Sequence, residues 1–211
     1  MAWHPPQIDS TDAATWVYTE RDRHFWPPEG LVPEDAKLIV DIGCNVGYST
    51  AMFAYEWKQA KVIGVDMIPE ATDKSRVNCA EFGDRVEIYT QAIGFPEREE
   101  GAIFNIASPI SRLRRYEIDH TGHTTYPTVN VISLDNFLKK AGILGQEIDY
   151  LKMDIEGAES EVIRDGGEWS KFTKACIIEF HYDGRDVLDP IMYGLGFDLT
   201  NNHQGQPVWF K

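Results

Sequence analysis

Short apolar runs recur along the chain after residue 36, and each run stops at an acidic residue, a glycine or a histidine. Such runs are typical of strands that are buried on both faces, because these strands lack the alternation of apolar and polar residues found at a solvated sheet surface. The pattern predicts core strands at residues 37–43, 61–66, 85–94, 148–154 and 174–181.

Segments with helical spacing separate these strands. In the first of them, Val46, Phe53 and Trp57 can share one helix face. The spacing predicts helices at residues 46–60, 69–83, 133–142, 157–167 and 185–196, followed by a closing β-hairpin at 197–202 and 206–211. Alternating strands and helices in this order imply an α/β fold with a parallel sheet and right-handed crossovers.

Two segments lack this regularity. Residues 1–36 are rich in aromatic residues and proline, and we expect them to cap the domain formed by residues 37–211. Residues 102–108 and 128–134 have the composition of strands, and the polar segment 107–127 between them is expected to be a substrate loop, because long loops in compact domains usually serve binding.

The composition narrows the range of partners. The chain has 211 residues, a net charge of -14 and a pI near 4.8. Such acidity repels phosphate backbones, so we expect no nucleic acid partner. No apolar run approaches the roughly 20 residues that cross a bilayer, and we expect no membrane association. The aromatic residues near the N-terminus are compatible with a homodimer.

The expected compartment is the cytoplasm. The stretch MAWHPPQIDS lacks the basic and apolar regions of a signal peptide. Cys44, Cys79 and Cys176 are far apart in the sequence and form no CxxC pair, which favours a reducing environment.

The first chemical signal is VDIGCNVGYST, where the first strand meets the first helix. Gly43 and Gly47 allow a sharp turn and the close approach of a ligand, and Asn45 tolerates a left-handed backbone. The spacing is not that of a dinucleotide fold, and Asp41 would repel a phosphate. Asp41 suits a cation, and the sulfonium of S-adenosylmethionine is such a ligand.

Further polar residues follow the next two strands. Asp66 ends the second strand, where a carboxylate can accept hydrogen bonds from ribose hydroxyls. Gln91 and Ala92 lie near the end of the third strand, where an adenine could rest. Because the carboxyl ends of parallel strands share one edge of a sheet, these residues predict a single cofactor site.

The chain resembles class I methyltransferases in VDIGCNVGYST and GVD, which correspond to their first and second motifs. VISLDNFL, IDYLKMDIEGAESEVIRDGG and CIIEFH resemble the FkbM family, whose D-x-E-G-x-E stretch is matched by Asp154, Glu156, Gly157 and Glu159. This resemblance implies a Rossmann-like fold with a seven-stranded, mostly parallel sheet and helices on both faces. It also implies S-adenosylmethionine as cofactor, with contacts from Cys44, Tyr48, Ser49 and Met67 as well.

The resemblance further implies methylation of a small molecule, most often at a hydroxyl in natural-product or sugar metabolism. Asp154 ends the fourth strand and is expected to span the cofactor and the acceptor. Glu156 is either a substrate contact or a helix-start acid, and Glu159 is expected to cap the following helix. The candidate bases are Asp154, Glu179 and His181, since deprotonation of a hydroxyl needs a proton acceptor at a strand end.

Several alternatives stay open. Asp154, Glu179 and His181 can also form a site for Mg²⁺ or Mn²⁺, although the metal-free reaction is favoured. An N-methyltransferase or a non-catalytic cofactor-binding scaffold would use the same pocket. Tyr18 and Trp26 either line the substrate site or merely cover the sheet. Arg114 and Tyr126 would reach the acceptor from the substrate loop.

Overall fold

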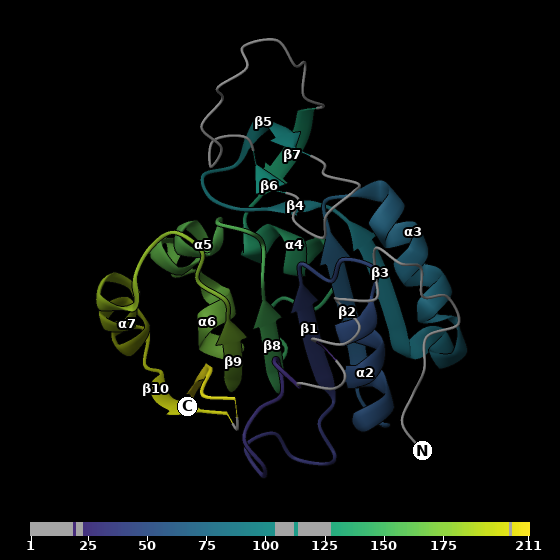
Figure 1. Ribbon diagram of the computed structural model, residues 1–211, viewed down its shortest axis with the longest axis horizontal. Helices are drawn as coiled ribbons and strands as arrows, with labels where there is room; N and C mark the ends of the chain where they lie inside the picture. Colours follow the sequence, from purple (N-terminus) through teal and green to yellow (C-terminus); the bar gives the residue numbers. More distant parts are fainter. Residues whose placement is uncertain (1–18, 20–22, 104–111, 114–127, 203) are drawn as a thin grey trace.

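The computed structural model describes Thr19 and residues 23–103, 112–113, 128–202 and 204–211. A seven-stranded sheet runs through its centre in the order β10-β11-β9-β8-β1-β2-β3 (Figure 1). The strands are β1 (Leu38–Ile42), β2 (Lys61–Asp66), β3 (Val86–Thr90), β8 (Tyr150–Met153), β9 (Ala175–Ile178), β10 (Asp198–Asn201) and β11 (Pro207–Phe210).

The pairing confirms the predicted mostly parallel sheet. β1 pairs in parallel with β2 and with β8, and β8 pairs in parallel with β9. In this sheet only β11 runs the other way, because it is antiparallel to both β9 and β10. The parallel strands therefore bring the ends of β1, β2, β3 and β8 to one edge of the sheet (Figure 1).

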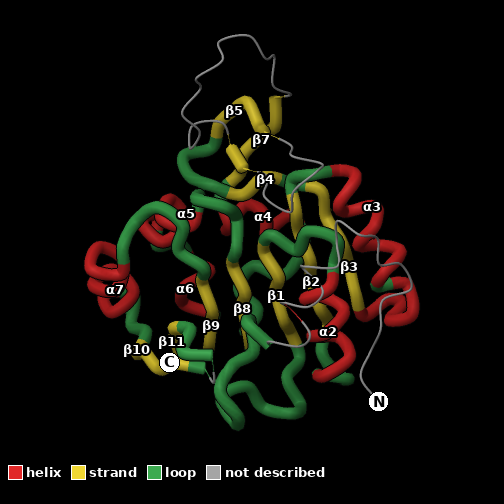
Figure 2. The backbone as a smooth tube through the Cα atoms, viewed as in Figure 1, coloured by secondary structure: helices red, strands yellow, loops and turns green. Residues whose placement is uncertain are grey.

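Helices cover both faces of this sheet (Figure 2). They are α2 (Tyr48–Glu56), α3 (Pro69–Asn78), the 3₁₀ helix η2 (Ala80–Arg85), α4 (Leu134–Lys140), α5 (Glu159–Asp165), α6 (Glu168–Phe172) and α7 (Arg185–Gly194). Ser133 caps α4, since its hydroxyl accepts a hydrogen bond from the Asn136 N–H. No helix among the described residues is long and apolar enough to span a bilayer.

Two apolar cores lie on opposite faces of the sheet. Successive residues of β1 alternate between them: Val40 packs with α4, α5 and α6, whereas Ile39 packs with α2. Asp41 continues this alternation and therefore lies in the layer of α2, behind the glycine turn rather than above it.

A second, smaller sheet lies beyond the carboxyl edge of the first (Figure 1). It contains β4 (Ala92–Ile93), β5 (Arg98–Ile103), β6 (Arg112–Leu113) and β7 (Thr128–Ile132). The predicted strand 85–94 is thus split between the two sheets. The strand that we expected at 102–108 begins earlier, at Arg98, and its remainder beyond residue 103 lies outside the described residues.

The segment before β1 packs against the face that carries α2. Tyr150 donates a hydrogen bond to the Phe25 carbonyl at 2.8 Å, and Asn202 donates one to the Trp26 carbonyl at 3.0 Å. The Trp26 ring is buried between Phe53 and Trp57. Trp26 therefore covers the sheet, which is one of our two expectations for it. The structure does not support the other expectation, that Trp26 lines the substrate site.

Candidate active site

The turn after β1 has a left-handed backbone at Gly43, Asn45 and Gly47, with φ of 77°, 49° and 85°. A Cβ atom at Gly43 would lie 1.6 Å from the Asp154 carbonyl oxygen. A Cβ atom at Gly47 would lie 2.3 Å from the Ser75 hydroxyl. Only glycine therefore lets the turn pack this closely against the end of β8 and against α3.

A pocket opens directly above this turn, at the carboxyl ends of β1, β2 and β8. It encloses about 610 Å³, part of which is open to solvent. The predicted residues that line it are Gly43, Asn45, Asp66, Met67, Gln91, Ala92, Asp154 and Glu156. The lining residues that the sequence did not reveal are apolar: Ile42, Val65, Ile68, Ile93, Ile155 and Ala158.

Asp66 faces this pocket with both carboxylate oxygens held by the backbone. Oδ2 accepts a hydrogen bond from the Asn45 N–H at 2.9 Å, and Oδ1 accepts one from the Ile68 N–H at 3.0 Å. Burial raises the pKa of Asp66. Each oxygen keeps a further lone pair, so this fixed carboxylate can still accept hydrogen bonds from a ligand.

Gln91 contributes to the pocket in a different way. Its side-chain amide donates to the Asn130 carbonyl at 2.6 Å, and its amide oxygen accepts from Lys140 at 3.0 Å. These contacts join the smaller sheet and α4 to the end of β3. The Gln91 side chain is therefore already paired, and the neighbouring Ala92 and Ile93 supply an apolar wall.

Asp41 does not face the pocket, contrary to our expectation. It is fully buried and accepts hydrogen bonds of 2.6 Å from the hydroxyls of both Ser49 and Thr50, in the first turn of α2. Its other oxygen lies 3.3 Å from Lys152 Nζ. The cation that Asp41 meets is thus part of the chain.

Several other residues of the glycine motif also lie behind the pocket rather than in its lining. Cys44, Tyr48 and Ser49 are buried, and Gly47 packs against α3. Burial raises the pKa of the Cys44 thiol well above its ordinary value, so the sulfur stays protonated. These residues shape the turn, and the structure does not bring their side chains to the cofactor space.

Lys152 is the residue at this site that our sequence analysis missed. Its side chain is 2% exposed, and Nζ donates to the Gly43 carbonyl at 2.6 Å. Nζ also lies 3.6 Å from Asp154 Oδ2 and 4.7 Å from the centre of the Phe25 ring. Although burial favours the neutral amine, the charges of Asp41 and Asp154 raise the pKa of Lys152. The ammonium thus links the turn to the end of β8.

Glu159 does not form the helix cap that we expected, because α5 begins without a hydrogen bond from a capping side chain. Its side chain is 2% exposed, and it accepts hydrogen bonds from the Ile155 N–H at 2.8 Å and from the Gly157 N–H at 2.9 Å. The oxygen that binds Ile155 also lies 3.0 Å from His181 Nδ1. Glu159 therefore fixes the loop after β8 and orients the imidazole.

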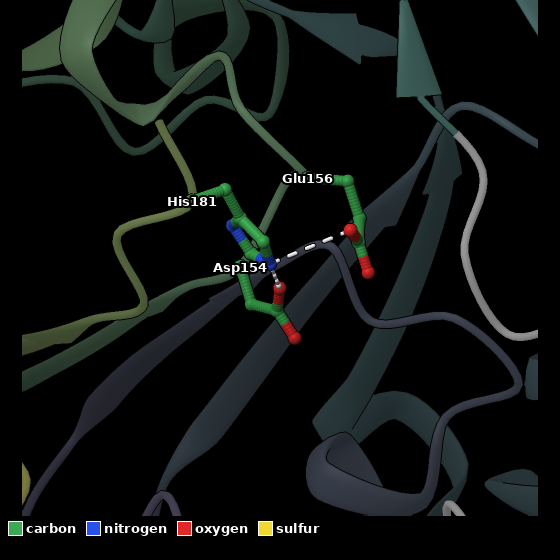
Figure 3. A group of neighbouring side chains, drawn as sticks. All are labelled: Asp154, Glu156 and His181. Carbon is green, nitrogen blue, oxygen red and sulfur yellow. Dashed lines mark ion pairs between the residues drawn. The ribbon is translucent and has the colours of Figure 1, made fainter. Parts of the chain in front are cut away.

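His181 directs its other nitrogen at two carboxylates (Figure 3). Nε2 lies 3.4 Å from Glu156 Oε2 and 3.9 Å from Asp154 Oδ1. Although burial opposes its charge, the hydrogen bond with Glu159 and the nearby carboxylates raise the pKa of His181 to about 9. Burial and the charge of Asp154 raise the pKa of Glu156 to about 7.

Glu179 does not join this cluster. It follows β9, and its Oε2 lies 3.7 Å from His24 Nε2. Within the part of the chain that the structure describes, the group whose atoms come within 4.8 Å of one another is Asp154, Glu156 and His181. The expected set of Asp154, Glu179 and His181 is therefore corrected, with Glu156 in the place of Glu179.

The remaining predicted substrate contacts lie outside the described residues. They are Tyr18, Arg114 and Tyr126, together with most of the expected substrate loop at 107–127.

The chain belongs to the FkbM family of methyltransferases, because the methyltransferase FkbM domain matches residues 41–199. This match includes the glycine turn, Asp66, the acidic loop after β8 and His181. Methyl transfer is thus the activity of the class, and S-adenosylmethionine is the cofactor that the family implies.

Individual relatives agree with this class. The chain is 26% identical over 174 residues to NoeI, a 2-O-methyltransferase of Sinorhizobium fredii. The matched residues cover 75% of this chain and 68% of NoeI. A trans-aconitate 2-methyltransferase of Azoarcus is 44% identical over 43 residues, or 20% of this chain and 17% of that protein. The fold is similar to that of an O-methyltransferase family protein from Burkholderia thailandensis, with a TM-score of 0.52 and 12% identity over 86% of this chain and 52% of that one.

Proposed function

We propose that this protein transfers the methyl group of S-adenosylmethionine to a hydroxyl oxygen of a small molecule. The observation that carries the proposal is that the pocket and the Asp154, Glu156 and His181 cluster meet at one edge of the sheet. The pocket above the glycine turn ends at Asp154 and Glu156, and these same residues face His181. A donor in the pocket would therefore present its methyl group to a proton-accepting cluster.

The pocket lining suits the parts of the donor. Asp66 would accept the ribose hydroxyls, since its carboxylate is fixed by Asn45 and Ile68 and faces the pocket. Met67, Ala92 and Ile93 would pack against the adenine. The positively charged methionine end would then lie near Gly43 and Asp154.

Methyl transfer breaks the bond between sulfur and the methyl carbon while a bond forms between that carbon and the acceptor oxygen. The sulfur keeps the electron pair, and the hydroxyl loses its proton. The protein must hold the oxygen about 3 Å from the methyl group and accept the proton. Burial and the charge of Asp154 raise the pKa of Glu156 to about 7, which suits a proton acceptor near neutral pH.

This geometry changes the expected base. His181 is protonated at neutral pH because its pKa is about 9, so it cannot accept a further proton there. Glu179 is turned to His24. We therefore assign proton acceptance to Glu156, orientation of the acceptor to Asp154, and balance of their negative charge to His181.

A small molecule is favoured over a nucleic acid for two reasons. The net charge of -14 repels a phosphate backbone. The trans-aconitate 2-methyltransferase, which is similar over a short stretch, is named for a small acceptor. The 2-O-methyltransferase NoeI, which is similar over most of this chain, supports oxygen as the methylated atom.

Transfer of a labelled methyl group tests the proposal. The chain is incubated with methyl-labelled S-adenosylmethionine and with separated small-molecule, RNA and protein fractions of a cell extract. We expect label in the small-molecule fraction, and NMR of the product should show a methoxy carbon. Label confined to RNA or protein would overturn the small-molecule assignment, and no label in any fraction would favour a cofactor-binding scaffold.

An amine acceptor is the second candidate, favoured by the acidity of the cluster. Carboxylates at Asp154 and Glu156 would attract a cationic amine. An amine needs no strong base once it is neutral. Glu156→Gln should therefore keep much of the rate with an amine, whereas it should lose about 10²-fold or more with a hydroxyl.

A further inference from the structure

Carboxylates outnumber cationic side chains around the end of β8. The charges of Asp154, Glu159 and Glu179 act on Glu156, and those of Asp41 and Asp154 act on Lys152. Lys152 offsets part of this charge from behind, where it contacts Asp41 and Asp154 Oδ2. The opposite side of Asp154 faces Glu156 and His181, so a further cation is favoured at that point.

The cluster has the dimensions of an ion site. One atom each from Asp154, Glu156 and His181 lie within 4.8 Å of one another (Figure 3). Three atoms at separations of this size share a point about 2–2.8 Å from each of them, which spans the oxygen distances of Mg²⁺ and Ca²⁺. Small changes in side-chain rotation would thus bring all three to one ion.

An independent feature is the support behind His181. Nδ1 lies 3.0 Å from Glu159 Oε1, and Glu159 is itself held by two backbone N–H groups of the loop after β8. Histidines that bind metals usually donate their second N–H to a carboxylate in this way, which fixes the tautomer and aims the free nitrogen. Here that nitrogen, Nε2, points between Asp154 and Glu156, and the ion would replace the proton that Nε2 carries in the ion-free protein.

We propose that Asp154, Glu156 and His181 bind one divalent cation, Mg²⁺ or Mn²⁺, at the boundary between the donor and the acceptor. Two carboxylate oxygens suit either ion, and the imidazole nitrogen favours Mn²⁺, because Mg²⁺ prefers oxygen ligands. Asp154 and Glu156 also line the pocket, so the ion lies beside the methionine end of the donor. Its part in catalysis rests on the proposed function.

The ion would hold the acceptor oxygen and favour its deprotonation. Glu156 can bind it through one oxygen and accept the hydroxyl proton on the other. Three protein ligands leave open positions on an octahedral ion. An acceptor with two neighbouring oxygens, such as a vicinal diol, can fill two of them, and this is the class of substrate that the site would select.

Binding of Mn²⁺ by the full chain, stripped with a chelator and kept free of donor, tests the site. The free ion is followed by its paramagnetic resonance signal. We expect one bound Mn²⁺ per chain with a submillimolar Kd. Glu156→Gln and His181→Ala should each weaken it at least tenfold. Glu168→Gln makes the same chemical change at an exposed acid paired with Lys171, and it should leave the affinity unchanged.

Calorimetry with S-adenosylhomocysteine, without metal, separates this proposal from the proposed function and shows that each variant is folded. If His181→Ala fails to fold, His181→Asn replaces it. No Mn²⁺ bound at millimolar concentration, or equal binding by parent and site variants, overturns the ion site even when S-adenosylhomocysteine binds. Mn²⁺ binding that the site variants lose supports the ion site, and the absence of S-adenosylhomocysteine binding would then overturn the function alone.

Discussion

Replacing Lys152 with methionine tests how the site is held together. Methionine has a similar length but no charge, so the change removes the ammonium while filling most of its volume. Asp41, which is fully buried, would keep only the hydroxyl donors of Ser49 and Thr50. The Gly43 carbonyl would lose its 2.6 Å hydrogen bond.

The structure sets the size of the effect. Removing one partner of a buried ion pair costs about 3–5 kcal/mol, because the other charge is left without compensation. Lys152 and Asp41 are 2% and 0% exposed, so solvent screens this pair little. Lys152→Met should therefore lower the free energy of unfolding by about 3–5 kcal/mol, a large part of the ~5–15 kcal/mol of a typical domain.

A double variant isolates the charge. Asp41→Asn in the Lys152→Met background removes the uncompensated carboxylate and keeps an oxygen for the two hydroxyls. Residues in one network couple by about 0.5–3 kcal/mol, so the second change should recover about 2 kcal/mol instead of adding damage. Lys171→Met, at a lysine that is 64% exposed, should stay within about 0.5 kcal/mol of the parent.

Urea denaturation followed by circular dichroism measures these differences, provided that the variants share one m-value. A loss below about 1 kcal/mol for Lys152→Met would contradict the importance of the buried pair. Additive losses in the double variant would show that Lys152 acts through its packing and not through Asp41.

Two further stability predictions use the same denaturation assay. Gly43→Ala should cost at least about 3 kcal/mol of stability, because the added Cβ meets the Asp154 carbonyl and the left-handed backbone is strained. Gly142→Ala, with φ 72° and open space around it, should cost only the strain of about 1–2 kcal/mol. Equal losses for the two variants would refute the close approach at Gly43. Burial disfavours the charged form of Asp149, but Lys174 and two backbone N–H groups outweigh it and lower the pKa of this carboxyl group. The carboxylate therefore stabilises the fold above the unfolded-state pKa of about 3.9. This contribution is lost as the pH falls through the lower folded-state pKa. Asp149→Asn should therefore cost about 2 kcal/mol at pH 7 and far less near pH 3, and a pH-independent difference would exclude this linkage.

Local patterns were sufficient for the central sheet. The apolar runs at β1, β2, β8 and β9 are buried on both faces, and such runs have few alternatives in a chain that alternates with helices. The smaller sheet was harder to predict. β5 reads REEGAI, and its charged residues pair with β7 across an antiparallel ladder that only tertiary contacts reveal.

The site shows the same division. Gly43 and Asp66 were predicted correctly as pocket residues, since turn chemistry and strand ends are visible in sequence. The partners of Asp41 were not predicted, because the register between neighbouring strands determines which residues it contacts. Lys152 is the Cα partner of Asp41 between β1 and β8, so pairing the two strands in sequence would have provided a signal. The contact of Glu159 with His181 was not predicted, because an acid at a helix start has an ordinary explanation.

The central claim is that the pocket at the strand ends binds S-adenosylmethionine through Asp66. Calorimetric titration of the parent, Asp66→Asn and Asp73→Asn with S-adenosylhomocysteine tests it directly, because Asp73 is an exposed acid on α3 paired with Arg76. We predict one site per chain, at least tenfold weaker binding by Asp66→Asn, equal to about 1.4 kcal/mol, and no change for Asp73→Asn. Absence of binding by the folded parent at millimolar ligand, or equal affinities for all three proteins, would contradict the account.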